Sequence, residues 1–147
     1  MTKILIKRLS KQVSLPKYET SGSSGMDLAA NIDTNISIDP GNSAIIPTGL
    51  ALSIPKGFEV QIRPRSGLAA KQKISVLNTP GTIDADYRGE IFVTLFCLST
   101  LGSYEIKHGE RIAQLVVSKN QPFTWNEVTK LDNTKRGIDG HGSTGKR

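Results

Sequence analysis

The sequence has one cysteine, few aromatic residues and no long apolar run in its 147 residues. With Cys97 alone, the chain can form neither an internal disulfide nor a thiolate cluster around a metal, which fits a reducing compartment. No segment approaches the ~18 consecutive apolar residues of a membrane span. The apolar stretch near the N-terminus, residues 4–6, is too short for a signal peptide. We therefore expect a cytoplasmic protein with no membrane partner.

Aromatic residues make up only 5% of the chain and are not interleaved with basic ones. Proteins that bind single-stranded nucleic acid use such interleaving, so this composition disfavours a nucleic-acid partner. The net charge of +6 still suits a polyanion, whether nucleic acid, membrane surface or nucleotide triphosphate. Because the basic residues are scattered outside the C-terminus, charge alone does not choose among these.

Short apolar segments, many of them β-branched, alternate with turn residues at intervals of roughly ten. This spacing predicts one all-β domain with very little helix, folded either as a barrel or as a jelly-roll sandwich. We expect strands over residues 1–9, 35–38, 43–46, 50–54, 58–62, 91–98 and 111–117. Residues 91–98 are apolar at almost every position, which predicts a strand buried on both faces. Only residues 66–73 have the composition of a short helix.

The C-terminal residues differ in composition from the rest. Residues 136–145 contain four glycines and almost nothing to bury, so this segment should be mobile when free. We therefore divide the chain into a β domain over residues 1–132 and a flexible glycine-rich arm over residues 133–147.

Five stretches rich in Gly, Ser, Asp or Arg border the expected strands: residues 24–30, 64–69, 81–90, 109–115 and 136–145. In this order they resemble the five sequence motifs of the trimeric dUTPase family, over residues 18–145. The resemblance implies a jelly-roll-like distorted β-barrel that forms a homotrimer and hydrolyses dUTP to dUMP and pyrophosphate with Mg²⁺. Such an enzyme lowers dUTP and supplies dUMP for thymidylate synthesis. It also implies shared active sites, with motifs one, two and four from one subunit, motif three from a second and the tail from a third.

The third stretch is the most specific of the five. By resemblance, Asp84 is the general base that orients and deprotonates the attacking water. Tyr87 would stack on the deoxyribose where a 2′-hydroxyl would collide. Asn78 would read the uracil edge, because an amide offers both donors and acceptors. Gly81 and Ile83 complete the expected substrate-binding residues of this stretch.

Arg65, Ser66 and Gly67 open the expected helix. A helix N-terminus presents unpaired N–H groups, and an arginine can bind phosphate through two hydrogen bonds. The resemblance assigns these three residues to the phosphates of the substrate.

Asp27 and Gln114 belong to the first and fourth stretches. Magnesium usually keeps several waters while it binds phosphate oxygens. The resemblance therefore implies that Asp27 holds the ion through water, and that Gln114 binds an ordered water or a phosphate oxygen. We interpret Glu110 and Arg111 as structural charges.

The tail offers a guanidinium, two hydroxyls and glycine amides, which together can bind an anion. The resemblance makes it a lid over the γ-phosphate and the base, with Arg136, Gly142, Ser143 and Thr144 as binding residues. The family usually has Phe where this chain has His141. We expect His141 to stack on uracil, more weakly and with a dependence on pH.

Each stretch also has a purely structural explanation. Ser66 can cap the helix beside a solvated Arg65, and residues 84–86 can be a turn with two solvated acids. Tyr87 can be a partly buried core aromatic, and the tail can be a disordered solubilising segment.

Two other functions compete with dUTP hydrolysis. A dCTP deaminase shares the fold and part of the phosphate-binding pattern, but it needs a Glu that acts on an amino-bearing base. The set of Asn78, Asp84 and Tyr87 favours hydrolysis instead. A non-catalytic basic β module that binds nucleic acid fits the charge but not the aromatic content.

Overall fold

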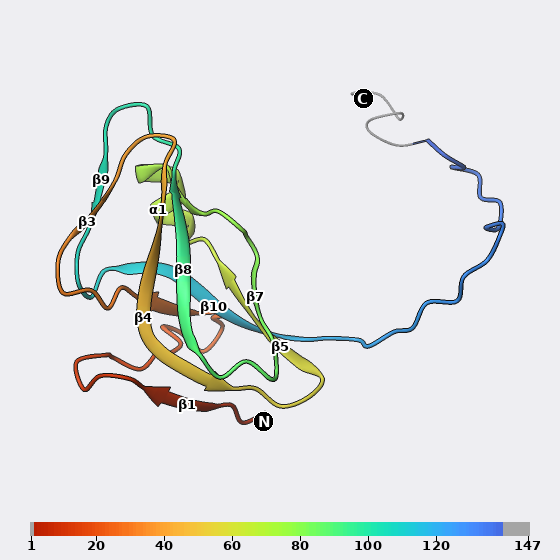
Figure 1. The fold of residues 1–147 in the computed structure, drawn as a ribbon, viewed down its shortest axis with the longest axis horizontal. Helices are drawn as coiled ribbons and strands as arrows, with labels where there is room; N and C mark the ends of the chain where they lie inside the picture. Colours follow the sequence, from red (N-terminus) through yellow and green to blue (C-terminus); the bar gives the residue numbers. More distant parts are fainter. Residues whose placement is uncertain (1, 140–147) are drawn as a thin grey trace.

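The computed structural model describes residues 2–139, as a β-sheet body followed by an extended segment (Figure 1). The expected all-β architecture is confirmed. The strands of the described part are β1 Leu5–Arg8, β2 Met26–Ala29, β3 Ile36–Ile38, β4 Ser43–Ser53, β5 Phe58–Arg63, β6 Ile74–Val76, β7 Gly81–Ile83, β8 Glu90–Cys97, β9 Tyr104–Ile106 and β10 Arg111–Lys119. The expected helix is α1, Ser66–Gln72.

The strands pair in an antiparallel manner into three sheets, which do not join into a closed barrel within residues 2–139. We call the sheet with the order β1-β4-β8-β6 the β4–β8 sheet, and the sheet with the order β2-β10-β5-β7 the β5–β10 sheet. The small third sheet pairs β3 with β9. Consecutive strands such as β4 and β5 lie in different sheets, which gives the jelly-roll-like connectivity.

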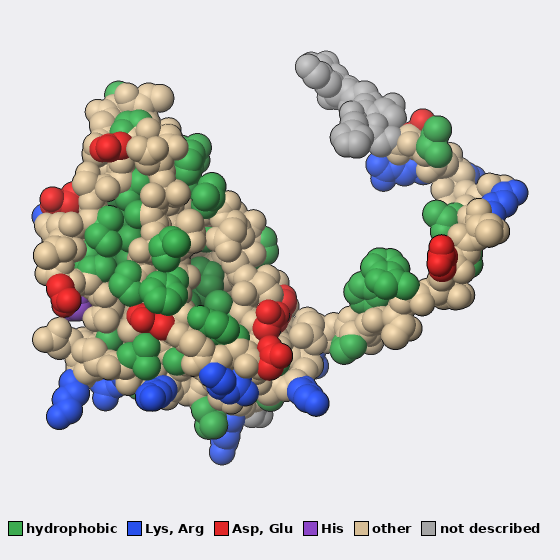
Figure 2. Space-filling view, in the orientation of Figure 1, with side chains coloured by type: hydrophobic (Ala, Val, Ile, Leu, Met, Phe, Trp, Pro, Cys, Tyr) green, Lys and Arg blue, Asp and Glu red, His purple; other side chains and the backbone are tan. Residues whose placement is uncertain are grey.

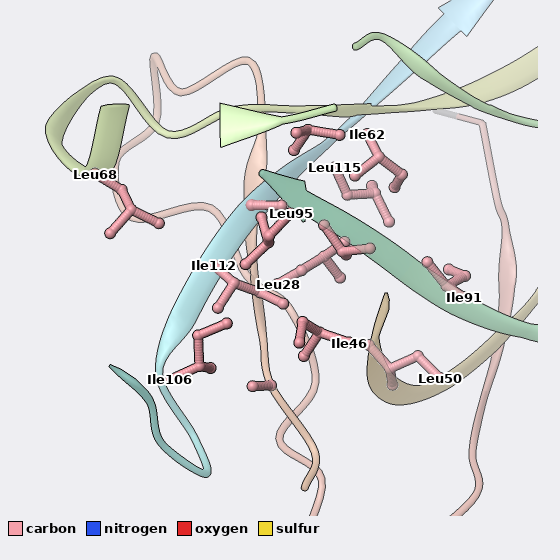
Figure 3. Close-up of a cluster of buried hydrophobic side chains, with 14 of the residues drawn as sticks. Leu28, Ile46, Leu50, Ile62, Leu68, Ile91, Leu95, Ile106, Ile112 and Leu115 are labelled. Carbon is pink, nitrogen blue, oxygen red and sulfur yellow. The ribbon is translucent and has the colours of Figure 1, made fainter. Parts of the chain in front are cut away.

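The hydrophobic core lies between the two four-stranded sheets. Leu28 on β2 and Leu115 on β10 meet Ile46 on β4 and Leu95 on β8 there (Figure 3). Ile46 and Leu95 are both fully buried. Burying each such side chain contributes about 1.5–3 kcal/mol to folding, so this layer is what holds the sheets together.

The strand over residues 91–98 departs from the prediction that both of its faces are buried. In β8, alternate residues are buried and partly exposed, and Phe92 is 48% exposed. Ile45 on the neighbouring strand is 64% exposed, and Figure 2 shows hydrophobic side chains gathered over β4 and β8. The prediction was wrong for the single chain, because no element of residues 2–139 covers the outer face of this sheet.

Residues 43–46 and 50–54, expected as two strands, form the single long strand β4. Its pairing with β8 shifts register between Pro47 and Ala51, so the extra residues form a β-bulge. Gly49 lies in this bulge with φ of +68°, a left-handed conformation that glycine adopts without strain. The glycine lets the strand continue where the sequence suggested a break.

Helix α1 begins after Arg65, whose backbone is extended, and ends at Lys73 in the left-handed conformation with φ of 58°. Arg65 is therefore the N-cap residue and Ser66 is not, which contradicts the structural explanation of Ser66 as a helix cap. The N-cap makes no side-chain hydrogen bond. Within residues 2–139, no helix has the length and apolar character needed to cross a membrane.

Residues 120–139 follow β10 as an exposed segment that lies away from the sheets (Figure 1). Phe123 and Trp125 contact each other edge to face, with ring centroids 4.9 Å apart. Both rings are largely exposed to solvent. The proposed boundary at residues 132 and 133 falls inside this segment and stays a prediction.

Candidate active site

A hollow of about 250 Å³ lies where β6 and β7, edge strands of the two four-stranded sheets, approach each other. We call it the β7 cavity. Its lining brings together the five residues expected from the third stretch and its approach: Asn78, Gly81, Ile83, Asp84 and Tyr87. Residues of β5, β6 and β8 complete the wall. The cavity therefore depends on both sheets.

Gly81 begins β7 opposite Ile62 of β5. A Cβ at Gly81 would lie 3.3 Å from the Cβ of Ile62 and 3.4 Å from Nδ2 of Asn78. These distances are tighter than ordinary contacts. The glycine thus allows the amide of Asn78 to lie against the strand at the wall of the cavity.

Asp84 follows β7 directly and is exposed at the rim of the β7 cavity. Its backbone oxygen accepts a hydrogen bond from the backbone N–H of Tyr87 at 3.2 Å. Residues 84–87 thus form a turn, and Asp86 is also exposed, as the structural explanation of this segment expected. The same turn places a carboxylate and an aromatic ring on one cavity, which that explanation does not require.

Tyr87 is 42% exposed, which contradicts its interpretation as a core aromatic. Its hydroxyl donates to the backbone oxygen of Glu90 at 2.9 Å. Its ring lies against Gly89, where any side chain would collide with it. The ring is therefore held at the cavity by the start of β8.

Arg65 and Asp27 form an ion pair outside the β7 cavity. The Nε of Arg65 donates to Oδ1 of Asp27 at 2.9 Å, and its Nη1 donates to the backbone oxygen of Arg111 at 3.0 Å. The Nη1 of Arg111 donates to Oδ2 of Asp27 at 3.1 Å. Asp27 therefore lies between two guanidinium groups, and Arg65 is not a solvated arginine. This ion pair agrees with the interpretation of Arg111 as a structural charge, although the sequence analysis did not name Asp27 as its partner.

Gln114 and Ser66 line a second hollow together with Thr79 and Pro80. The Nε2 of Gln114 donates to the backbone oxygen of Pro64 at 2.9 Å. Its Oε1 lies against Gly25, where a Cβ would come within 2.6 Å of it. The Gln114 amide is thus fixed by the two segments that carry Arg65 and Asp27.

Tyr104 and Glu110 form a further polar pair that sequence reasoning missed. The hydroxyl of Tyr104 donates to Oε1 of Glu110, and Oε2 of Glu110 accepts the backbone N–H of Lys107 at 3.1 Å. Burial, followed by the hydrogen bond and the negative charge of Glu110, raises the pKa of Tyr104 to about 12. The pair lines a hollow that also contains Arg65 and Gly67, so it belongs to their surroundings.

Among residues 2–139, no group of three or more His, Cys, Asp or Glu side chains could hold a metal ion. A carboxylate has about four lone-pair sites, and the two guanidinium groups use one on each oxygen of Asp27. The remaining sites can accept hydrogen bonds from water. This donor set fits an ion that is held by phosphate oxygens and water, and it does not fit a cage of protein ligands.

Arg136 lies in the exposed segment after β10, and its Nε donates to the backbone oxygen of Asp139 at 2.8 Å. It contacts neither the β7 cavity nor the Asp27 pair. His141, Gly142, Ser143 and Thr144 lie outside the described residues. Within residues 2–139, Arg136 is therefore not brought to the other site residues.

Known proteins match this chain over nearly its full length. The family model for dUTPase matches residues 11–145. A deoxyuridine 5′-triphosphate nucleotidohydrolase of Desulfotalea psychrophila is 52% identical over 138 residues, which are 94% of this chain and 91% of the relative. The protein of the same name from Fusobacterium nucleatum is 49% identical over 99% of this chain and 100% of the relative.

Solved structures agree with the sequence relatives. A Staphylococcus bacteriophage 80alpha dUTPase mutant with dUpNHpp has a TM-score of 0.88 to this chain and 26% identity, and the match covers 99% of both chains. The matched region contains both four-stranded sheets and every described site residue. On these matches, this chain belongs to the dUTPase family of nucleotide hydrolases.

Proposed function

We propose that the chain hydrolyses dUTP to dUMP and pyrophosphate, with the β7 cavity as the pocket for the deoxyuridine. The observation that carries this proposal is the convergence of Asn78, Asp84 and Tyr87 on one cavity in a member of the dUTPase family. The product dUMP then serves as the precursor for thymidylate synthesis.

The β7 cavity is suited to reading a nucleoside. The Asn78 amide offers a donor and an acceptor to the uracil edge, and Gly81 and Ile83 form the wall beside it. A cytosine would leave these polar groups mispaired, which rejects a wrong base more strongly than shape does. The ring of Tyr87 covers the deoxyribose and leaves no room for a 2′-hydroxyl.

Asp84 acts as the general base. It accepts a proton from a water molecule whose oxygen forms a bond to the α-phosphorus, while the bond from that phosphorus to the bridging oxygen breaks. Pyrophosphate leaves in line with the attacking water. The exposed carboxylate at the rim has the access to water that this step needs. Base catalysis of this kind contributes about 10²–10⁴-fold to the rate.

The phosphates bind at Arg65, Ser66 and Gly67. Of the five N–H donors of a guanidinium, Arg65 uses two within the chain, so one on Nη1 and both on Nη2 stay available for phosphate oxygens. Ser66 is exposed and does not cap the helix, and Gln114 lines the same hollow. These groups neutralise the charge that develops during phosphoryl transfer, where positioning matters more than covalent help.

Mg²⁺ would be held by Asp27 through its water shell, as the donor set around this carboxylate permits. The bound ion would supply positive charge to the phosphate oxygens. The arm over residues 133–147 closes the site, with Arg136, Ser143 and Thr144 on the γ-phosphate, Gly142 beside them and His141 on the uracil.

The working enzyme is a homotrimer with shared sites. Two observations support this arrangement. In one chain neither Arg65 nor Asp27 lines the β7 cavity, and Arg65 lines a separate hollow. The outer face of the β4–β8 sheet also exposes Ile45 and Phe92. Association of three copies would cover this apolar face and bring the two halves of a site together.

The test is pyrophosphate release from each dNTP and from UTP in the presence of Mg²⁺, for the wild-type chain and for Asp84→Asn. The wild-type chain should act on dUTP in preference to dCTP, dTTP and UTP. Asparagine keeps the shape of the side chain but cannot accept the proton, so kcat for dUTP should fall by about 10²–10⁴-fold with little change in KM.

Asp86→Asn is the matched control, because this exposed neighbour does not line the β7 cavity. Its kcat should stay near the wild-type value. Equal turnover of all dNTPs, or an unchanged kcat in Asp84→Asn, would contradict the proposal. Release of uracil nucleotide from dCTP would indicate a deaminase instead.

A further inference from the structure

Tyr87 depends on Glu90 for its position. The Tyr87 hydroxyl donates to the backbone oxygen of Glu90 at 2.9 Å, at the first residue of β8. Between these residues, Gly89 gives the ring its contact surface. Because the ring is otherwise partly exposed, its place in the β7 cavity follows the place of the β8 strand end.

Glu90 is in turn attached to the bulge of β4. Its Oε1 accepts a hydrogen bond from the backbone N–H of Gly49 at 2.7 Å, across 41 residues of sequence. Gly49 is buried and left-handed, with side chains packed where its Cβ would be, so the bulge is a firm attachment. The side chain of Glu90 therefore connects the interior of the β4–β8 sheet to the ring at the cavity.

We propose that Glu90 is a positioning residue that fixes Tyr87 and thereby discriminates deoxyribose from ribose. The inference rests on the proposed function, in which Tyr87 covers the sugar. A ring excludes a 2′-hydroxyl only where it cannot move aside. Misplacement of a positioning group by ~1 Å can cost up to about a hundredfold in rate, so a loose anchor would erase much of the discrimination.

The test compares kcat/KM for dUTP and for UTP in Glu90→Ala and Glu90→Gln. Glu90→Ala removes the acceptor for the Gly49 N–H and should lower the dUTP/UTP ratio by about tenfold. Glu90→Gln keeps a carbonyl oxygen in the same place, so the ratio should stay within about twofold of wild type. Equilibrium binding of dUMP and UMP, measured by calorimetry, should show the same change in ratio without any chemical step.

Thr48→Val is the matched control for lost stability. Thr48 is buried in the same bulge, and its side chain donates to the backbone oxygen of Ile91 at 2.7 Å and not to Glu90 or Tyr87. This variant should lower the denaturation midpoint and leave the dUTP/UTP ratio unchanged.

Tyr87→Phe removes the anchoring hydroxyl alone and should lower the ratio in the same direction as Glu90→Ala. The double variant with Glu90→Ala and Tyr87→Phe should lower the dUTP/UTP ratio no further than either single change, because both changes break the same connection between the bulge and the ring.

A wild-type ratio in folded Glu90→Ala would overturn the inference, and so would an equal loss in Thr48→Val. Should Glu90→Ala fail to fold, a wild-type ratio in Tyr87→Phe would overturn it instead. A wild-type chain that does not hydrolyse dUTP, or that accepts UTP equally well, would show that the proposed function itself is wrong.

Discussion

At the scale of single residues, the polar side chains near Asp27 are arranged by their pairing partners. Asp27 holds both Arg65 and Arg111, and Gln114 is held by Pro64. Each pairing leaves part of the side chain free, three N–H donors on Arg65 and the second N–H of Nε2 on Gln114. These free groups are what a triphosphate can bind, so the chain prepares the site before the substrate arrives.

Gly25 is a residue-scale test of this arrangement. A Cβ at Gly25 would lie 2.6 Å from Oε1 of Gln114 and 3.2 Å from the backbone oxygen of Leu115. Gly25→Ala should displace the Gln114 amide and raise KM for dUTP by about tenfold, with a smaller effect on kcat. Gly22→Ala is the control, because a Cβ there meets no atom within 4 Å. Equal KM values in the two variants would remove Gln114 from the substrate site.

Tyr104 predicts a dependence of stability on pH. Its pKa is about 12 in the folded chain against 10.0 for a free side chain, because burial and Glu110 disfavour the phenolate. A raised pKa in the folded state stabilises the fold below pH 10, and this contribution is lost as the pH rises from 10 to 12. The stability gap between wild type and Tyr104→Phe should therefore be largest near pH 8 and should shrink above pH 10.

Urea denaturation midpoints at pH 8, 10 and 11 measure this gap. Tyr18→Phe is the control, since Tyr18 is 51% exposed and has no such partner within residues 2–139. A gap that stays constant across this range would show that neither burial nor Glu110 raises the pKa of Tyr104 in the folded chain.

At the scale of elements, the β4 bulge is connected to the β7 cavity through Glu90. The bulge shifts the register between β4 and β8, and its Gly49 N–H donates to the side chain of Glu90, whose backbone oxygen accepts the hydrogen bond of Tyr87. Bulges commonly occur near functional sites because they re-aim a side chain without ending a strand.

Gly49→Ala tests the bulge. A Cβ at Gly49 would lie 2.8 Å from Nδ2 of Asn31 and would overlap Val13, in addition to the cost of a left-handed conformation. The conformation alone costs about 1–2 kcal/mol, and the overlap should bring the loss of unfolding free energy above this range. Gly41→Ala, with φ of 78° and open space around it, should show only the conformational cost. Equal losses in chemical denaturation would contradict the packing argument.

At the scale of the whole molecule, a single chain exposes an apolar face, and its proposed site residues lie in two separate groups, at the β7 cavity and around the Arg65–Asp27 pair. Leu77 on the edge of the β4–β8 sheet is 53% exposed, in line with Ile45 and Phe92 on the same outer face. An exposed apolar patch of this kind marks an interaction surface. Association into a trimer would cover this apolar patch and would also give β8 the second buried face that its sequence predicts.

Mixing two inactive variants tests the shared site. Asp84→Asn and Arg65→Ala each remove one half, so each should be inactive alone. If the halves come from different subunits, random mixed trimers should recover activity at about one site in four. Sedimentation should show a trimer for both variants. No recovery after unfolding and refolding together would place Asp84 and Arg65 of one site in the same chain.

The sequence by itself determined the fold class and the kinds of residue in the site. Strand periodicity and turn glycines are local properties, so the β architecture and helix α1 were predictable from neighbouring residues. The proposed site residues came from the resemblance of five short stretches, such as residues 81–90, to the motifs of the dUTPase family, and their roles stay predictions.

Only the tertiary structure decided which of these residues meet and which faces are covered. Asn78 and Asp84 share a cavity because the edge strands of two sheets approach each other, and Asp27 meets Arg111 across 84 residues of sequence. The burial of β8 was mispredicted for a related reason. Apolar residues predict that a face of a strand is buried. Which segment buries that face depends on contacts between distant segments or separate chains, and no local pattern encodes these contacts.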